Sequence, residues 1–275
     1  MTSSIGPITC VTIATPDLAS SERAYVGHLG YQVGARGFVT AAEAAAWTCT
    51  ASAGARCLTV HPPAGRDFSF RFVETPAAAP YRAFRNYGWN AAELIVRDVD
   101  ALAVQLKNSP FELLGPPQDL SFTDAIRAMQ VRGPAGEILY LTQFKRQLEA
   151  LPSPAARCDV DRAFIVIVGG ASLDALLAYY AREFGVPEPQ RMESRVKAMS
   201  EVFGLSPEHR YQIAALPLLG DCYIEADQMP PQAMAPQVPA NQLPPGIAIV
   251  SFASPTGSSS CRRGAAGELI EVVPR

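Results

Sequence analysis

The stretch Gly133-Pro134-Ala135-Gly136-Glu137-Ile138-Leu139-Tyr140-Leu141 recurs as Gly264-Ala265-Ala266-Gly267-Glu268-Leu269-Ile270-Glu271-Val272, at a fixed offset of 131 residues. In both copies a glycine-rich turn with the pattern GxAGE leads into a run of apolar residues that predicts a β-strand. Two copies of one strand behind the same turn predict a chain built from repeated modules.

A second repeat is a strand followed by an amphipathic helix, and it occurs three times. The expected strands are Ile8 to Ala14, Ala91 to Val96 and Ala163 to Val168. Each is followed by apolar residues at helical spacing: Leu18, Tyr25 and Leu29 before Gly30; Val99, Leu102, Ala103 and Leu106; and Leu173, Leu176, Leu177, Tyr180 and Phe184 before Gly185. A weaker match relates the segment His61 to Pro76 to the segment Leu216 to Pro230.

These repeats divide the chain into four modules. Module 1 covers about 8–76, module 2 about 88–143, module 3 about 160–230 and module 4 about 246–275, with Pro-rich linkers near 146–157 and 229–245. The opening glycines of modules 2 and 4 are 158 residues apart and their closing strands 131, so module 4 lacks about 27 residues (158 − 131). We therefore expect a truncated fourth module.

Composition narrows the class of protein. The chain has 275 residues, which suffices for one large domain or two ordinary ones. The net charge of −3, with both signs scattered along the chain, argues against nucleic acid or an anionic membrane as a partner. The first residues lack the features of a signal peptide and the six cysteines form no CxxC pair, so we expect a soluble, cytoplasmic protein with reduced thiols.

The order strand, helix and three strands, βαβββ, resembles the module of the vicinal oxygen chelate superfamily of glyoxalases, extradiol dioxygenases and bleomycin-resistance proteins. The resemblance rests on Thr15-Pro16-Asp17-Leu18 with Tyr25 and Leu29-Gly30, on Val96-Arg97-Asp98-Val99-Asp100-Ala101-Leu102, and on the two GxAGE strands. It implies an α+β fold in which paired βαβββ modules close curved-sheet barrels around a pocket. We expect an N-terminal domain over 1–145, made of modules 1 and 2, and a C-terminal domain over 158–275, made of module 3 and the degenerate module 4.

In that superfamily a divalent metal usually lies in the pocket, bound by His on first strands and Glu on last strands. The resemblance places the first-strand positions at Cys10, Ala91, Ile165 and about Ile249, and the last-strand positions at Arg71, Tyr140, Glu225 and Glu271. None of the first-strand positions is histidine, whereas a transition-metal site needs three or four convergent ligands. We therefore expect no metal and no other cofactor.

Three residues are the expected catalytic groups of the N-terminal pocket. Glu93 follows Ala91 by two positions on the same strand face, and its apolar neighbours would raise its pKa into the range of acid–base catalysis. Arg71 would bind a substrate oxyanion, and Tyr140 would hydrogen-bond the same substrate. The alternatives are a buried Glu93–Arg71 ion pair and a Tyr140 that only fills the core.

Cys10, His61 and Gln130 are the expected substrate contacts of the same pocket. The alternatives are an inert buried thiol for Cys10 and a surface position for His61, and the register of Gln130 stays open. In the C-terminal half, Glu225 and Glu271 would face each other and hold a hard cation if module 4 kept its pocket; otherwise both are solvated.

Three functions compete. The first is a metal-independent enzyme of lyase or isomerase type, acting on a small carbonyl-containing or aromatic metabolite in the N-terminal pocket. The second is a non-catalytic protein that binds or sequesters a small molecule, as the bleomycin-resistance branch does, and the third is a metal-dependent dioxygenase or glyoxalase-like enzyme. Because the truncated module 4 leaves module 3 without a full partner, we also expect a homodimer.

Overall fold

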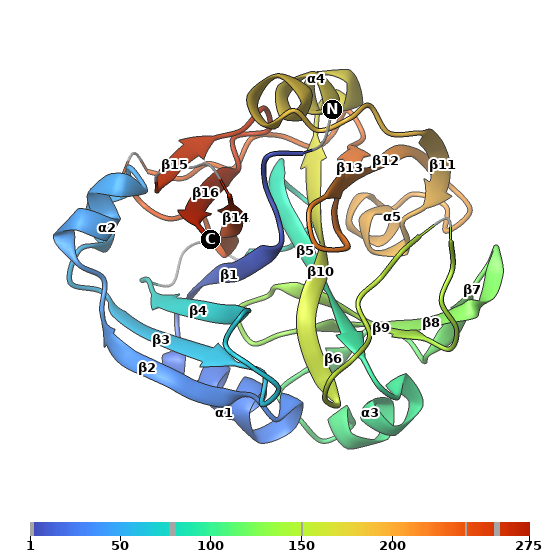
Figure 1. Ribbon diagram of the computed structural model, residues 1–275, viewed down its shortest axis with the longest axis horizontal. Coiled ribbons are helices and arrows are strands. Elements are labelled where there is room, and N and C mark those ends of the chain that lie inside the picture. Colours follow the sequence, from blue (N-terminus) through green and yellow to red (C-terminus); the bar gives the residue numbers. More distant parts are fainter. Residues whose placement is uncertain (1–2, 77–80, 150, 240, 256–258) are drawn as a thin grey trace.

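The computed structural model describes residues 3–76, 81–149, 151–239, 241–255 and 259–275. Two curved mixed sheets lie side by side, and helices α1, α3 and α4 lie outside them (Figure 1). The predicted α+β fold with four modules is confirmed.

Modules 1 and 2 have the expected strand–helix–strands order. Module 1 contains β1 (Ile8–Thr15), α1 (Leu18–Leu29), β2 (Gln32–Phe38), α2 (Ala41–Ala46), the 3-10 turn η1 (Thr50–Ser52), β3 (Arg56–His61) and β4 (Ser69–Glu74). Module 2 contains β5 (Gly88–Val96), α3 (Val99–Leu106), β6 (Glu112–Leu113), β7 (Gln118–Leu120), β8 (Thr123–Arg132) and β9 (Ile138–Phe144).

Modules 3 and 4 differ in completeness. Module 3 contains β10 (Val160–Gly170), α4 (Leu173–Phe184), β11 (Arg191–Arg195), α5 (Lys197–Phe203), β12 (Arg210–Leu218) and β13 (Cys222–Gln228). Module 4 contains β14 (Gly246–Ser254), β15 (Ser260–Arg263) and β16 (Leu269–Pro274), with no helix among its described residues. The fourth module is therefore truncated as expected.

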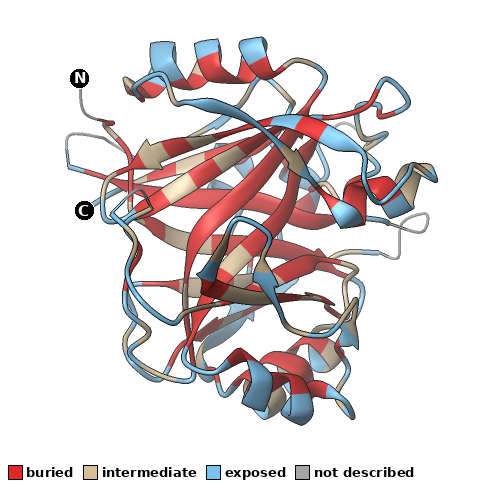
Figure 2. Cartoon of the chain, turned by 90° about the vertical axis from the view of Figure 1, so that its right-hand side faces the viewer, coloured by how far each residue is buried: buried red, intermediate tan, exposed pale blue. Residues whose placement is uncertain are grey.

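The outer helices begin and end at residues that satisfy their free backbone groups. Asp17, Asp98 and Ser172 each accept a hydrogen bond from the first turn of the helix that follows. Gly30 and Gly185 end α1 and α4 in the left-handed conformation, with φ of 74° and 62°. Each of these helices buries one face against a sheet and exposes the other, as the burial colours show (Figure 2).

Strand order corrects the expected pairing of the modules. One sheet has the order β15-β16-β14-β1-β4-β3-β2, and the other has β11-β12-β13-β10-β5-β9-β8-β6 with β7 paired to β8. Antiparallel pairs β1–β14 and β5–β10 join the modules, so module 1 pairs with module 4 and module 2 with module 3. The expected pairing of 1 with 2 and of 3 with 4 is wrong, and so is the division of the sheets at residues 145 and 158.

This pairing also removes the reason for the expected homodimer. Module 3 does not lack a partner, because β10 forms its antiparallel pair with β5 of module 2 inside the same chain. The truncated module 4 likewise completes a sheet with module 1. The homodimer stays a prediction whose stated physical basis is wrong.

The glutamate of each GxAGE turn is a buried structural group. Glu137 accepts hydrogen bonds from the Tyr25 hydroxyl at 2.8 Å and from the amide of Ala135 at 2.9 Å. Glu268 accepts from the Tyr180 hydroxyl at 2.9 Å and from the amide of Ala266 at 2.8 Å. These hydrogen bonds connect α1 of module 1 to the last turn of module 2, and α4 of module 3 to the last turn of module 4.

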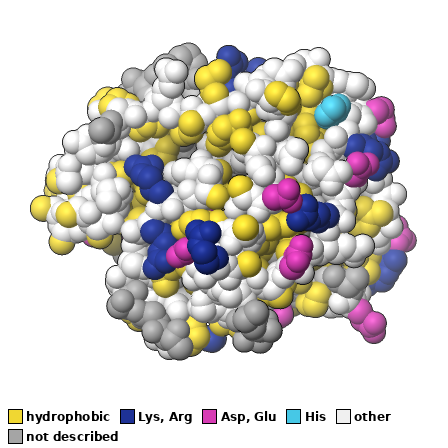
Figure 3. Space-filling model, turned by 90° about the horizontal axis from the view of Figure 1, so that it is seen from above, with side chains coloured by type: hydrophobic (Ala, Val, Ile, Leu, Met, Phe, Trp, Pro, Cys, Tyr) yellow, Lys and Arg dark blue, Asp and Glu magenta, His cyan; other side chains and the backbone are white. Residues whose placement is uncertain are grey.

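The cysteines, the helix lengths and the surface charges concern the chain as a whole. All six cysteines are free thiols, as expected. No helix in the described residues is long and apolar enough to cross a membrane. On the side of α4, basic and acidic side chains are interspersed (Figure 3), and Glu183 pairs there with both Arg182 and Arg262.

Candidate functional site

Each curved sheet has an inner, concave face. In all four modules the first and last strands pair in the same register, so equivalent residues lie on this face. The last-strand residues Arg71, Tyr140, Glu225 and Glu271 pair in the sheets with Thr12, Glu93, Ile167 and Ser251, respectively. Each of these partners lies two residues after the first-strand position expected from the sequence. The predicted register is therefore consistent across the four modules.

The inner face of modules 1 and 4 carries an ion pair whose groups are satisfied by the protein. Arg71 Nη2 lies 3.0 Å from Glu271 Oε2, and each side chain is 17% exposed. The Arg71 Nε donates to Thr12 Oγ1 at 2.9 Å, and its guanidinium lies over the Trp47 ring at 4.5 Å.

Glu271 is fully engaged in this network. It accepts hydrogen bonds from Trp47 Nε1 at 2.8 Å and from the hydroxyl of Ser251. Although burial opposes its ionisation, Arg71 together with these donors lowers the pKa of Glu271. Both charges are thus compensated within the protein, which is the arrangement of a structural ion pair.

The inner face of modules 2 and 3 is different, because its carboxyl groups lack such partners. Glu93 is half-buried on β5 and accepts one hydrogen bond, from Thr142 Oγ1 at 2.6 Å. Burial raises the pKa of Glu93 to about 7, and the bond from Thr142 only partly opposes this shift. At neutral pH Glu93 therefore exchanges a proton readily, as a general acid or base must.

Tyr140 and Gln130 lie beside Glu93 on neighbouring strands. Tyr140 pairs with Glu93 between β9 and β5, and Gln130 pairs with Tyr140 between β8 and β9. Burial, followed by the charges of Glu225, Asp227 and Glu93, raises the pKa of Tyr140, so its hydroxyl stays protonated. Tyr140 is half-buried and its hydroxyl has no hydrogen-bond partner among the described residues.

Two further carboxyl groups come from β13, at alternate positions on the same face. Glu225 is half-buried, and burial together with the charges of Asp227 and Glu93 raises its pKa well above the usual range. Asp227 is fully buried, neither of its oxygens has a hydrogen-bond partner in the described part of the chain, and burial raises its pKa to about 7. We call the inner surface formed by Glu93, Tyr140, Glu225 and Asp227 the acidic inner face.

No basic residue compensates the acidic inner face. Within the described ranges, no Lys, Arg or His forms an ion pair with Glu93, Glu225 or Asp227, and none lowers their pKa. Buried carboxyl groups without partners cost stability, so their presence favours a functional role.

A short helix accompanies the concave side of each sheet. Helix α5 lies in the curve of the sheet of modules 2 and 3, and α2 lies at the open side of the other sheet (Figure 1). Ser200 of α5 shares a hydrogen bond of 3.0 Å with the Tyr211 hydroxyl of β12, which fixes α5 to the sheet. The acidic inner face is therefore partly roofed, while Glu93, Tyr140 and Glu225 keep some exposed surface.

The structure brings three of the six expected site residues together. Glu93, Tyr140 and Gln130 are neighbours, as their registers show. Arg71 and Cys10 lie on the other sheet, and His61 is buried at the end of β3 with its Nδ1 2.9 Å from the carbonyl oxygen of Pro62.

The expected Glu93–Arg71 pair in one cavity is therefore wrong. Arg71 pairs with Glu271, and Glu93 bonds to Thr142, because β5 joins β10 rather than a strand of module 1. The expectation that Glu225 faces Glu271 fails for the same reason, since these residues belong to different sheets.

Sequence reasoning missed Asp227 and Thr142. The period of two along a strand carries the signal for Asp227, which follows Glu225 by two positions. Thr142 likewise follows Tyr140 by two positions, but its hydrogen bond to Glu93 depends on the parallel pairing of β5 with β9.

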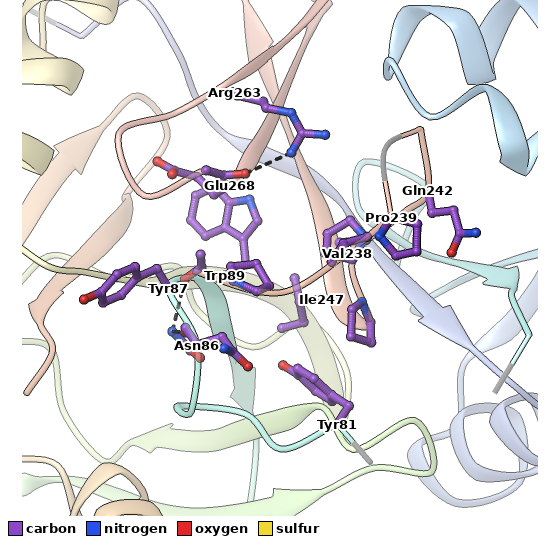
Figure 4. A pocket seen from close by; sticks show the side chains of 17 residues that line it. Tyr81, Asn86, Tyr87, Trp89, Val238, Pro239, Gln242, Ile247, Arg263 and Glu268 are labelled. Atoms are coloured by element: carbon purple, nitrogen blue, oxygen red, sulfur yellow. Dashed lines mark hydrogen bonds between the residues drawn. The ribbon is translucent and has the colours of Figure 1, made fainter. Parts of the chain in front are cut away.

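A separate cavity of about 190 Å³ lies at the seam between the sheets (Figure 4). Its lining includes Tyr81, Trp89, Ile247 and several residues of the Pro-rich linker. The one acidic residue in its lining, Glu268, is already engaged by Tyr180 and Ala266. The lining also includes Arg263 and the buried hydroxyl of Tyr81, which has no hydrogen-bond partner among the described residues.

The residues present do not fit the metal that the fold suggests. The first-strand positions carry Cys10, Ala91, Ile165 and Ile249, none of them histidine. Among the described residues, no three His, Cys, Asp or Glu side chains are grouped so that they could hold a metal ion. We derive no chemistry through a metal.

Comparisons with known proteins identify the fold. No family model matches the sequence, and no curated protein matches it. The structure is similar to glyoxalase I from Zea mays, with 12% identity over 97% of this chain and 92% of that chain and a TM-score of 0.64. It is also similar to a Bacillus subtilis protein provisionally described as a dioxygenase, with 10% identity over 100% of this chain and 86% of that chain and a TM-score of 0.61.

Both likenesses extend over nearly the whole chain, so they include all four modules and not one half alone. At this level of identity they establish the architecture. The chain has the vicinal oxygen chelate fold.

Proposed function

We propose that this protein is a metal-independent enzyme of lyase or isomerase type, which moves a proton on a small carbonyl-containing or aromatic compound at the acidic inner face. The observation that carries the proposal is Glu93, a half-buried carboxyl with a pKa near 7 and a single hydrogen bond, beside the free hydroxyl of Tyr140. Arg71, which the sequence suggested as the oxyanion partner, has no part in it because Glu271 occupies its guanidinium.

The proposed chemistry follows from the protonation states of the two groups. Ionised Glu93 removes a proton from the carbon next to a substrate carbonyl, and the electron pair moves onto the carbonyl oxygen. Tyr140 donates a hydrogen bond to that oxygen, and protonated Glu93 then returns the proton to the same or a neighbouring carbon. Because Tyr140 stays protonated, it acts as a donor only.

Proton–deuterium exchange tests this step without knowledge of the net reaction. We expect the protein in D₂O to exchange carbon-bound hydrogens of one or more compounds in a panel of small ketones, aldehydes and hydroxyaryl compounds, followed by NMR. Glu93→Gln should abolish exchange, and Tyr140→Phe should reduce it by about 10²-fold through loss of the oxyanion donor. Glu188→Gln, which changes an exposed carboxyl far from β5 in sequence, is the matched control.

The pH dependence provides a second criterion. Base catalysis by Glu93 requires the ionised form, so the exchange rate should rise with pH and level off above about pH 7. Exchange that persists in Glu93→Gln would refute the proposed base. A compound that binds at this face and is never exchanged or converted would favour the non-catalytic alternative.

A further inference from the structure

The acidic inner face contains more carboxyl groups than proton transfer needs. Glu93 suffices as the acid–base group, yet Glu225 and Asp227 lie at the next inner positions along β13. Strand register places all three on the face that carries Tyr140: Glu93 pairs with Ile165 of β10 and with Tyr140 of β9, and Glu225 pairs with Ile167 of β10. The three carboxyl groups therefore share one face of the curved sheet, with β10 between Glu93 and the two groups on β13.

Asp227 gives an independent indication of a ligand. Its side chain is fully buried, and neither oxygen has a hydrogen-bond partner among the residues that the structure describes. A buried acceptor without a partner lowers the stability of the protein, and the loss is larger when the group is charged. By strand alternation Asp227 lies on the same face as Glu225, the face that also carries Glu93 and Tyr140.

The signs of the charges define what this region can bind. No basic side chain of the described chain pairs with the three carboxyl groups, so an anionic ligand would meet repulsion and no compensating donor. A ligand with a positively charged donor would satisfy the free oxygens of Glu225 and Asp227 at once. Glu225 keeps some exposed surface, which allows contact from solvent.

We propose that the acidic inner face binds a small organic cation, an ammonium compound, with Glu225 and Asp227 accepting hydrogen bonds from its N–H groups. The inference rests on the proposed site and deepens it by naming the charge of the substrate. The ammonium group lies against Glu225 and Asp227, and the uncharged, reactive part of the molecule extends toward Glu93 and Tyr140.

Three probes of equal size and different charge test the inference by binding alone. Benzylamine, benzyl alcohol and benzoate are titrated into the full chain at pH 7.5 by isothermal calorimetry and by ligand-observed NMR. We expect benzylamine to bind at least 10-fold more tightly than benzyl alcohol, and benzoate not to bind. Equal binding of all three probes, or preference for benzoate, would overturn the inference.

Substitutions locate the binding. Asp227→Asn and Glu225→Gln should each weaken benzylamine binding by about 10- to 100-fold, as expected for loss of a charged hydrogen-bond partner. Glu188→Gln should leave it unchanged. If Asp227→Asn fails to fold, as judged by circular dichroism, Glu225→Gln decides alone; unchanged affinity in the folded variant rejects the site.

Proton release is a further readout, since the carboxyl groups are partly protonated at neutral pH. The titratable groups that interact with Asp227 are Glu225 on its own strand, Tyr140 on β9 and Tyr211 on β12, and Glu93 on β5 interacts with Glu225. A bound cation lowers the pKa of the carboxyl groups, so calorimetry in phosphate and in Tris should report net proton release. Binding of Mg²⁺ or Zn²⁺ in place of the amine would overturn the organic-cation assignment.

Failure of this inference and failure of the proposed function are distinguishable. Amine binding without proton–deuterium exchange would support the cation site and reject the catalytic role of Glu93. Exchange of neutral compounds without amine preference would support the catalytic role and reject the cation site.

Discussion

The two buried tyrosine–glutamate pairs predict a loss of stability that depends on pH. Removal of the hydroxyl in Tyr25→Phe breaks the 2.8 Å bond to Glu137, and Tyr180→Phe breaks the 2.9 Å bond to Glu268. At pH 8 each substitution should lower the free energy of unfolding by about 1.5–3 kcal/mol, the range for hydrogen bonds to a charged group. At pH 5.5 each loss should shrink to about 0.5–1.5 kcal/mol.

The pH dependence follows from the ionisation of the glutamates. Burial raises the pKa of Glu137 and of Glu268 to about 7, against the bonds from tyrosine and backbone. Above pH 7 each tyrosine therefore donates to a carboxylate, and below it to a neutral acid, which is the weaker acceptor. Removing the tyrosine leaves the buried carboxylate with fewer donors, so the larger loss belongs to the higher pH.

Urea unfolding at pH 5.5 and pH 8, followed by circular dichroism, measures both losses. Tyr87→Phe is the matched control, because the Tyr87 hydroxyl has no hydrogen-bond partner among the described residues. The double variant should lose about the sum of the two effects, since the pairs share no residue. Equal losses at both pH values, or a similar loss in Tyr87→Phe, would refute the reasoning.

Three further predictions concern charge and metal. Arg71→Met should lower the free energy of unfolding by about 2–4 kcal/mol, because it leaves the Glu271 carboxylate without its cation at a site with little exposure; in chemical denaturation the double variant Arg71→Met/Glu271→Met should recover part of that loss. The free energy of unfolding of the wild-type protein should fall as pH rises from 5 to 8, because folding raises the pKa of Glu137 and of Glu268 from 4.5 to about 7. The stabilisation from protonating these groups in the folded state is complete below about pH 4.5 and is lost as pH rises through 7, which costs about 3 kcal/mol for each group. Thermal melts across this window measure the effect, and a melting temperature that does not decline would contradict the burial of these carboxyl groups. Elemental analysis should find no stoichiometric Zn, Fe, Mn or Ni, because the described residues offer no group of three ligands; near-unit metal whose removal abolishes function would favour the metal-dependent alternative.

Local patterns in the sequence were sufficient for the modules. The helical spacing of apolar residues predicted α1, α3 and α4, and Gly30 and Gly185 marked two of their ends, because a helix buries one face and stops where a left-handed residue follows. The GxAGE repeat predicted the last strands, and alternation placed Glu93 and Tyr140 on an inner face. These features depend only on neighbours within a few residues along the chain.

The function of the GxAGE glutamates was not visible in that pattern. Their partners, Tyr25 and Tyr180, are 112 and 88 residues away and look like ordinary core positions of amphipathic helices. Their hydrogen bonds arise only when the helix of one module packs on the turn of the next.

The sequence by itself thus determined the three complete strand–helix–strands modules, the truncation of the fourth module and the register within each module. Only the tertiary structure decided which modules pair, because each module has a first strand with a free edge, and all four first strands are similarly apolar. Nothing local selects β14 for β1 or β10 for β5; that choice depends on how helices, turns and both sheets pack together. Because of this pairing of modules, Arg71 forms an ion pair with Glu271, whereas Glu93 lies on a face with other carboxyl groups and has no basic partner in the described chain.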